Sequence, residues 1–557
     1  MKSSFPRWQS AALLALAILT LFLFLGSRGL NEPDEGRYAE IGREMAVSGD
    51  WLVPTLNGVE HFQKPPMVYW ATALSFKAFG FNNTAARLPS ALAALGTLFL
   101  TFWIGWRLFD ARTGLTAAFI LLCSLEFFFG ARLLTPDMTM GFWITAALAC
   151  LVKLHRAHRL EPSKPGSGSA WGWLFFVAMG LGFLTKGPMA FVVPIAAAVC
   201  WQWGLRKEGA PVRLPWLRGL LLMLLVGLSW FIAVALKNPD LLDYFVGDEL
   251  VKRFASAKHG RSKPFYFFVW VLPIGLTPWL FFFGAMLWDL LGKLRRKVRP
   301  SAEQALLLGW ILIPFLVLSA SGSKLPTYLL PLFPGLALSI AAWSRNDPPR
   351  RLWTGAFVAT LGLLTLLAVG IPVAGRFTTA PLPGTLWMAP GLLAAVYFFQ
   401  RNRAAAQVAL GLAAAALWLS ATHQAPLANP WLAQQASVEP LALKVRAAGD
   451  FGKATVFACE VRAHGWEFYL QSLTCLTRPD MDVVLPLDAD QQTRVIPGVK
   501  QCEPQMLGRA PAYGLVRKKR FEKSFTAGKW IVLGESGDFL LIGTPDTALA
   551  AGMKPRE

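Results

Sequence analysis

Long apolar runs separated by short polar loops make up most of the sequence up to about residue 422. Each run is about 20 residues long, the length that a helix needs to cross a bilayer. We expect about 13 such helices and hence a polytopic α-helical membrane protein. The first run follows Lys2 and Arg7, lacks an evident cleavage site, and is interpreted as a retained helix. The predicted spans are 9–27, 86–106, 114–131, 138–154, 171–185, 188–204, 216–236, 266–290, 304–321, 326–343, 352–373, 385–400 and 404–421.

The segment 66–80, PMVYWATALSFKAFG, is apolar but short, and it contains Lys77. We predict that it forms a helix on the membrane surface instead of crossing the bilayer. When it is left out of the count, the strongly basic loops, such as KLRRKVR at 293–299, share the side of the N-terminus. This is the arrangement that the positive-inside rule requires, so that side is assigned to the cytoplasm. The loops 27–65 and 237–265 then lie on the opposite side.

Composition agrees with this class of protein. Of 557 residues, 54% are hydrophobic and 16% are charged, and the mean hydropathy is +0.44. The net charge of +21 arises largely from the basic loops, as the positive-inside rule explains. The basic residues are scattered over many loops, so we expect no nucleic acid partner.

The region after the last span has a different pattern. Short β-like runs occur at 454–458, 482–485, 513–516, 530–533 and 539–542, separated by helical stretches and polar turns. We therefore predict a membrane domain at 1–425 and a soluble α/β domain at 426–557, on the side opposite the cytoplasm. No dinucleotide-binding glycine motif or P-loop is present in this region.

The 6 cysteines do not form a zinc-binding pattern. Three of them lie in predicted spans, where they serve packing, and the others are Cys459, Cys475 and Cys502. One disulfide is expected among these three in an oxidising compartment, and its pairing is left open. Glu60 and His61 are too few to define a metal site, so we predict chemistry without a metal.

The first exported loop contains NEPDEGRYAEIGREMAVSGDW. A helix is predicted from Pro33 to Ser48, with Gly49 ending it. Its pattern is amphipathic, so we expect it to lie along the membrane surface. Asp34 stands at its start, where it either caps the helix or serves as a catalytic group.

A second acid, Asp137, follows Thr135 and Pro136 in LLTPDMTM. This position also suits the start of a helix, and capping is again the alternative to a functional role. Both acids are predicted on the same, non-cytoplasmic face. We therefore take Asp34 and Asp137 as candidate catalytic residues.

Several cations are predicted on that face, where the positive-inside rule disfavours them. A charge deep in a bilayer costs about 2.5–3.5 kcal/mol, so these cations call for an anionic partner. Snorkelling to lipid headgroups is the alternative. Together they favour a lipid phosphate or pyrophosphate ligand. The candidate binding residues are Lys64, Arg37, Tyr38, Lys186, Arg261, Lys263, Lys324 and Tyr328.

The block PDEGRYAEIGREMAVSGDWLVPTLNGVEHFQKPP resembles the first exported loop of the C-type (GT-C) membrane glycosyltransferases. TKG at 185–187 and KLPTY at 324–328 are similar, in order and spacing, to the bacterial branch that transfers 4-amino-4-deoxy-L-arabinose to lipid A. The resemblance extends to about residue 345. The chain departs from it in the polar EHFQ before Lys64 and in the basic loop 258–263, which leaves the substrate preference open.

The resemblance implies a transferase with an undecaprenyl phosphate-linked donor and a lipid A phosphate as acceptor. Lys64 and Arg261 would stabilise the departing prenyl phosphate, because negative charge develops there. It also implies a monomeric enzyme of the bacterial inner membrane, with its site facing the periplasm. The product would have less negative charge, which implies resistance to cationic antimicrobial peptides such as polymyxin.

Two other functions remain open at this stage. A protein O-mannosyltransferase-like enzyme would share the acids of the first loop, and Asp34 would then act as a base on a hydroxyl acceptor. A lipid-phosphate flippase would favour ionisable residues along a path through the bilayer. The predicted clustering of these residues on one face disfavours a flippase.

Overall fold

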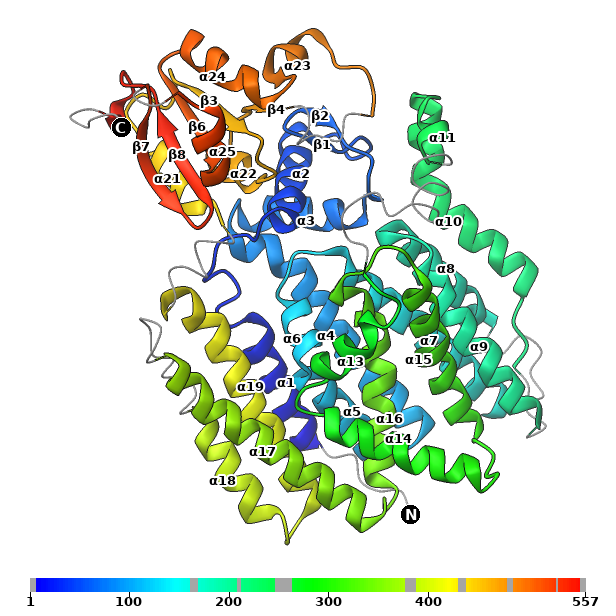
Figure 1. Cartoon of the computed structure of the whole chain (residues 1–557). Helices are drawn as coiled ribbons and strands as arrows, with labels where there is room; N and C mark the ends of the chain where they lie inside the picture. The colour runs from blue at the N-terminus through cyan, green and yellow to red at the C-terminus, as the bar shows by residue number, and fades with distance from the viewer. Residues whose placement is uncertain are drawn as a thin grey trace. The chain divides into compact units, whose positions relative to one another are not determined.

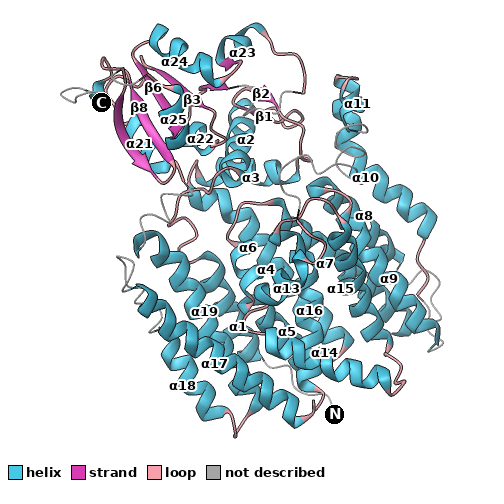
Figure 2. Ribbon diagram, viewed as in Figure 1, coloured by secondary structure: helices cyan, strands magenta, loops and turns pink. Residues whose placement is uncertain are grey.

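The computed structural model describes residues 7–160, 169–207, 212–245, 263–375, 387–428, 437–477, 484–526 and 529–550. The chain divides into two compact units. Unit 1 comprises Met1–Leu23 and Ser90–Thr422, and unit 2 comprises Phe24–Pro89 and His423–Glu557. Unit 1 is helical, whereas the strands belong to unit 2 (Figure 2).

Unit 1 contains most of the apolar helices (Figure 1). Within it, α7 packs on α8, α8 on α10, α9 on α15 and α17 on α18. Its helices are α1 (Arg7–Phe22), α4 (Asn83–Leu108, which begins in unit 2), α5 (Ala111–Cys123), α6 (Leu125–Ala131), α7 (Pro136–Leu160), α8 (Ser169–Lys186), α9 (Met189–Lys207), α10 (Trp216–Lys237), α11 (Leu241–Asp243), α13 (Phe267–Gly275), α14 (Leu280–Arg295), α15 (Ala302–Ala320), η2 (Pro326–Leu332), α16 (Phe333–Arg345), α17 (Arg350–Gly375), α18 (Ala389–Phe398) and α19 (Arg403–Ala428, which ends in unit 2).

Many of these helices have the length and apolarity of membrane spans. Among the described residues, 8 helices are long and apolar enough to cross a membrane, or up to 10 if each of two bent helix pairs is one span. Shorter apolar helices lie at Trp8–Phe22, Ala170–Lys186 and Ala389–Phe398. Each of these elements overlaps a span predicted from the sequence. The chain is therefore a polytopic helical membrane protein, as predicted.

Two of the helical segments are broken, and the breaks are bonded to each other. The chain bends by 70° between α5 and α6 and by 117° between α13 and α14. The N–H of Leu125 donates to the carbonyl of Thr277 (3.0 Å), and the indole Nε1 of Trp279 donates to the carbonyl of Ile120 (2.8 Å). Backbone groups inside an apolar bundle must find partners within the protein, and these bonds supply them.

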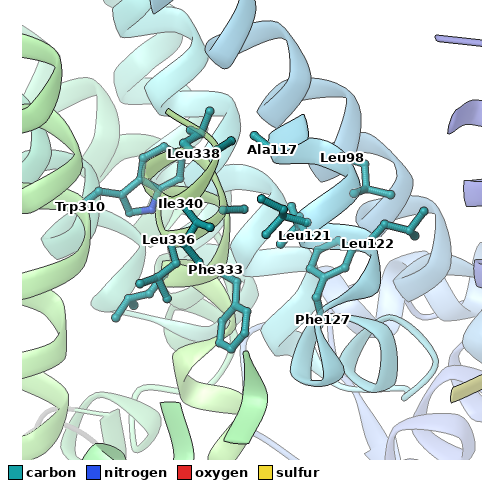
Figure 3. Close-up of a cluster of buried hydrophobic side chains, with 14 of the residues drawn as sticks. Leu98, Ala117, Leu121, Leu122, Phe127, Trp310, Phe333, Leu336, Leu338 and Ile340 are labelled. Atoms are coloured by element: carbon teal, nitrogen blue, oxygen red, sulfur yellow. The ribbon is translucent and has the colours of Figure 1, made fainter. Parts of the chain in front are cut away.

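The core of unit 1 is built from large apolar side chains on facing helices. Figure 3 shows part of it, where Leu121 and Phe127 from α5 and α6 lie near Phe333 and Leu336 from α16. All four side chains are at most 1% exposed. Because lipid tails are as apolar as these side chains, the packing stabilises unit 1 mainly through van der Waals contact.

The first loop belongs to unit 2, where it forms α2 (Asp34–Ser48), a hairpin of β1 (Thr55–Leu56) and β2 (Val59–Glu60), and α3 (Met67–Phe79). Helix α2 ends at Gly49, as the sequence predicted. Within segment 66–80, α3 is a helix of 13 residues and is shorter than the helices that qualify as candidate spans.

The polar face of α2 is buried, which its amphipathic pattern did not predict. An amphipathic helix along a membrane surface would leave its polar face in water, but Glu40, Arg43 and Glu44 are at most 7% exposed. Helix α2 packs against α3 and against α22 (Gly465–Leu470), so both of its faces are covered. The bidentate ion pair of Arg43 with Glu40, at 2.6 and 2.7 Å, makes this burial tolerable.

The C-terminal part of unit 2 is a mixed six-stranded sheet with strand order β5-β4-β3-β6-β8-β7. The four strands β5, β4, β3 and β6 are parallel, and β8 runs antiparallel to both β6 and β7. The elements are α21 (Glu439–Arg446), β3 (Thr455–Cys459), α22, β4 (Cys475–Thr477), α23 (Ala489–Arg494), β5 (Val495–Ile496), α24 (Val499–Gly508), β6 (Ala512–Arg517), α25 (Lys518–Ser524), β7 (Ile531–Ser536), β8 (Phe539–Gly543) and η5 (Ala548–Ala550).

Four of the five predicted strands are present, as β3, β6, β7 and β8. The predicted strand at 482–485 is not observed at Val484 and Leu485, and its first two residues lie outside the described residues. Instead, the short strands β4 and β5 extend the sheet. Their lengths of 3 and 2 residues are too short to leave an alternating pattern.

The division into units differs from the predicted domains, because 24–89 falls with the C-terminal sheet instead of the membrane helices. Side-chain and backbone hydrogen bonds account for this grouping. Asn57 exchanges two bonds with Thr474 at 2.8 and 2.9 Å, and the N–H of Leu30 donates to the hydroxyl of Tyr469 at 2.8 Å. Such contacts join segments more than 400 residues apart in sequence, which no local pattern reveals.

One disulfide joins Cys459 on β3 to Cys502 on α24. Cys475 remains a free, buried thiol. One disulfide and one remaining thiol were predicted for Cys459, Cys475 and Cys502. The structure gives the pairing that the sequence left open.

Candidate functional site

Asp34 and Arg37 form an ion pair at the start of α2. The guanidinium Nη2 of Arg37 lies 2.7 Å from Oδ1 of Asp34, and the Asp34 side chain is 35% exposed. Pro33 occupies the cap position of α2, and no side chain caps the helix there. The capping interpretation of Asp34 is therefore wrong, and its carboxylate is held by a cation one turn along the helix.

The segment before α3 brings Lys64 into the same unit. Gln63, the residue before Lys64, accepts a hydrogen bond from Nη1 of Arg37 at 3.3 Å. Arg37 thus contacts both Asp34 and the residue next to Lys64. Tyr38 is 4% exposed and its ring lies 6.0 Å from that of Tyr69 on α3. Tyr38 therefore fixes α2 on α3, and Arg37 also lies over its ring.

His61 lies next to these cations and is 2% exposed. Burial lowers the pKa of its imidazole well below the usual value, and the charges of Arg37, His464 and Lys64 lower it further. His61 is therefore neutral, and its buried Nε2 has no hydrogen-bond partner among the residues that the structure describes. Among the described residues, no group of three or more His, Cys, Asp or Glu side chains is placed to hold a metal ion.

Behind Asp34, a buried network fixes the backbone of the first loop. Arg87 on α4 is 0% exposed, and its guanidinium donates to both oxygens of Glu35 at 2.8 and 2.9 Å. It also donates to the carbonyls of Leu25, Arg28 and Gly29. Because Glu35 is the next residue after Asp34, this network positions the start of α2.

Glu32, the third acid of this segment, accepts a hydrogen bond from the N–H of Gly465 at 2.8 Å. Its other oxygen, Oε2, is buried and has no partner within the described part of the chain. Burial raises the pKa of its carboxyl well above the usual value. The Gly465 bond opposes this shift, and the charges of Glu467, Glu35 and Asp34 add to it. Glu32 thus favours its neutral form.

Asp137 forms the second group, in unit 1. It lies in the first turn of α7, is 3% exposed, and its Oδ1 pairs with the ammonium of Lys186 at the end of α8. Its Oδ2 accepts a hydrogen bond from the hydroxyl of Thr327 on η2 at 3.1 Å. Both oxygens of Asp137 are therefore bonded to side chains on other helices, which goes beyond a local cap.

Lys186 is held over an aromatic ring as well. Its Nζ lies 4.1 Å from the ring centroid of Tyr328, a cation–π geometry. The chain turns sharply after it at Gly187, whose φ of +114° is a conformation that side chains with a Cβ rarely adopt. Helix α8 thus ends at Lys186, and α9 begins two residues after the glycine.

Lys324 is buried, at 4% exposed, and its ammonium is occupied by backbone groups. It donates to the carbonyl of Lys263 at 3.1 Å and to that of Ser321. An ammonium has three donors, so one N–H is left for a further acceptor. The Lys263 side chain itself is exposed.

The predicted site residues therefore form two groups. Asp34, Arg37, Tyr38 and Lys64 belong to unit 2. The second group, in unit 1, consists of Asp137, Lys186, Lys263, Lys324 and Tyr328. Arg261 lies outside the described residues.

Sequence reasoning missed Gln63, Thr327 and Arg87. Thr327 lies inside the KLPTY motif, between two predicted residues, so that motif was the available signal. Arg87 is a charged residue at the start of the predicted span 86–106. A charge in that position suggests a buried partner of opposite charge.

The fold is found in solved structures. The crystal structure of ArnT from Cupriavidus metallidurans bound to undecaprenyl phosphate is similar, with a TM-score of 0.78 at 22% identity, covering 96% of this chain and 98% of that one. An apo archaeal oligosaccharyltransferase from Archaeoglobus fulgidus is similar at a TM-score of 0.53 and 14% identity, covering 94% and 70%. The chain thus has the same fold as these two structures.

The sequence is similar to named transferases. Undecaprenyl phosphate-alpha-4-amino-4-deoxy-L-arabinose arabinosyl transferase 1 of Sodalis glossinidius is 37% identical over 354 residues, covering 63% of this chain and 61% of the relative. The arabinosyl transferase of Edwardsiella ictaluri is 36% identical over 336 residues, covering 59% and 58%. The chain aligns with about three fifths of the length of these relatives. Residues 10–245 match the family described as dolichyl-phosphate-mannose-protein mannosyltransferase.

Proposed function

We propose that this protein transfers 4-amino-4-deoxy-L-arabinose from undecaprenyl phosphate to a phosphate of lipid A. The observation that carries the proposal is that each predicted acid is paired with a cation, Asp34 with Arg37 and Asp137 with Lys186. A substrate that combines a cationic sugar with phosphate groups requires both signs of charge at fixed positions. The names of the sequence relatives supply the sugar and the lipid carrier.

The transfer exchanges one bond at the anomeric carbon of the sugar. A phosphate oxygen of the acceptor attacks this carbon, and the bond to the oxygen of undecaprenyl phosphate breaks. The electron pair leaves with the prenyl phosphate, where negative charge accumulates. Lys64 and Arg261 are proposed to stabilise that charge, because cations are most effective where charge develops in the transition state.

Asp34 has a different proposed role from that of a strong base. An acceptor phosphate is already largely ionised near pH 7, so no proton has to be removed from it. We assign Asp34, with its carboxylate held by Arg37, to orienting the acceptor. Lys186, over the ring of Tyr328, and Lys324, with its remaining N–H, are proposed to hold phosphate oxygens.

The setting of the reaction is part of the same proposal. We propose that the protein has about 13 membrane spans and resides in the bacterial inner membrane. Its site and C-terminal α/β region would face the periplasm, and it would act as a monomer without a metal. Modified lipid A carries less negative charge, which would reduce the binding of cationic peptides such as polymyxin.

A protein O-mannosyltransferase-like activity is the second candidate. The match of residues 10–245 to the mannosyltransferase family favours it. In that reaction a serine or threonine hydroxyl is the acceptor, and Asp34 would remove its proton.

Mass spectrometry of lipid A tests the proposal. Cells lacking the gene are complemented with the full chain or with Asp34→Asn, and lipid A and membrane proteins are analysed. Addition of the amino sugar to lipid A by the wild-type chain alone is expected. Sugar found on protein would favour the mannosyltransferase, and unmodified lipid A with a transported donor would favour a flippase.

A further inference from the structure

Glu126 is a half-buried acid among the apolar helices of unit 1, and the sequence alone did not single it out. It lies on α6, within the bent α5–α6 pair. Among the described residues, its carboxylate takes part in no ion pair or hydrogen bond. In Asp137, by contrast, both carboxylate oxygens have partners. A charged group in such a place carries a large desolvation cost unless a partner offsets it.

The stem of Glu126 is fixed by close packing. A Cβ built on Gly275 would lie 2.9 Å from the Cβ of Glu126 and 2.9 Å from the Phe333 ring, so this glycine makes room for the side chain. The neighbouring residues Phe127 and Phe128 are at most 1% exposed. The stem of Glu126 is therefore held by apolar packing, beside Phe127 of the core drawn in Figure 3.

Nearby polar groups do not neutralise Glu126. The N–H of Leu125 is already bonded to Thr277 across the two helix breaks. The charged neighbour that acts on Glu126 is Asp137, which has the same sign. Lys186, the cation beside Asp137, pairs with that carboxylate and, among the described residues, makes no ion pair with Glu126. A cation supplied from outside the protein would balance this site.

We propose that Glu126 binds the ammonium group of the transferred amino sugar and thereby selects a cationic sugar over a neutral one. This inference rests on the proposed function, because the sugar is the one named for the sequence relatives. An ammonium accepts a single carboxylate partner with strong, charge-assisted hydrogen bonds. Calcium needs six or more oxygen ligands, and no group of three metal-ligating side chains exists among the described residues. Glu126 is thus a specificity residue, separate from the orienting role of Asp34.

Donor competition with the purified full chain tests this role. The two donors are undecaprenyl phosphate carrying the free amino sugar and the same lipid with the amine acetylated, which removes the charge. Glu126→Gln keeps the size of the side chain and removes its charge. We expect the ratio of kcat/KM for the amine donor to that for the acetylated donor to fall about 10- to 100-fold. The fall should arise mainly in KM for the amine donor.

Control variants distinguish a loss of sugar specificity from poor folding and from failure of the proposed function. Glu303→Gln, an acid in the first turn of α15, should keep the wild-type ratio. Glu126→Asp retains the charge and should recover part of the preference for the amine donor. This variant keeps the test valid if Glu126→Gln folds poorly. An unchanged ratio in Glu126→Gln, with normal melting temperature, would overturn this inference alone. Failure of the wild-type chain to transfer the amino sugar to lipid A would instead overturn the proposed function.

Discussion

Arg87 holds both carboxylate oxygens of Glu35, with Nε and Nη2 at 2.8 and 2.9 Å. The pair is sealed from water, since Arg87 is 0% and Glu35 2% exposed. Glu35 also accepts from Arg28 and from the N–H of Asn31. The start of α2, and with it Asp34, is therefore set by a buried charge network instead of by helix capping.

Removal of Arg87 should destabilise the protein strongly. Arg87→Met leaves Glu35 buried with one partner fewer and frees three backbone carbonyls, which should cost about 3–5 kcal/mol. Thermal unfolding of the purified protein in detergent measures the loss. Arg28→Met is the matched control, because Arg28 meets the same Glu35 at 2.9 Å but is 21% exposed, and its loss should be much smaller. Equal losses of stability in the two variants would show that Arg87 contributes no more to the network around Glu35 than Arg28 does.

Asp34→Asn should abolish transfer and leave the donor bound. The amide keeps the size of the side chain but removes the charge that Arg37 holds at 2.7 Å. Single-turnover transfer to lipid A and direct titration with undecaprenyl phosphate give the two readouts. A variant that modifies lipid A at a nearly normal rate would refute the role of Asp34. Lys64→Ala should instead weaken the binding of the prenyl phosphate, which the same titration measures.

The pair of Asp137 and Lys186 should behave as a coupled unit. Lys186→Met leaves a buried carboxylate without its cation. Asp137→Asn leaves the ammonium with the ring of Tyr328 and no carboxylate among the described residues. Each single variant should lose stability, while the double variant should lose less than the sum. A double-mutant cycle in thermal unfolding measures the coupling, expected at about 0.5–3 kcal/mol. Additive losses would show that the two side chains do not interact.

The helices of the chain were predictable because local patterns determine them. Apolar runs of sufficient length predicted the helices of unit 1, and Pro33 and Gly49 predicted the limits of α2. The strands β3, β6, β7 and β8 left an apolar β-like pattern, whereas β4 and β5 are too short to do so. Local signals thus describe elements, but they do not describe how those elements are buried.

The candidate site was predictable in its residue types and not in its pairings. Asp137 and Lys186 are 49 residues apart in sequence, and only the packing of α7 on α8 brings them together. From the sequence, Lys186 was expected to need an anionic ligand. In the structure its partner is Asp137, within the protein. Likewise, the burial of α2 depends on α22, which follows it by more than 400 residues.

Glu32→Gln should stabilise the protein increasingly as the pH rises. The pKa of Glu32 is raised well above 4.5 by burial, so the folded protein binds its proton more tightly than the unfolded chain does. The stability contributed by the protonated group is therefore present below about pH 4.5 and is lost as the pH rises through the folded pKa. Glutamine stays neutral and still accepts the bond from Gly465.

Melting temperatures of wild type and Glu32→Gln across pH 4 to 8 test this expectation. The two should converge near pH 4, and the variant should be the more stable above it. Asp490→Asn, at a side chain that is 74% exposed, is the control and should show a small difference at every pH. If the gap between wild type and Glu32→Gln does not grow with pH, Glu32 is ionised in the folded protein. The buried Oε2 would then require a cationic partner that the described residues do not supply.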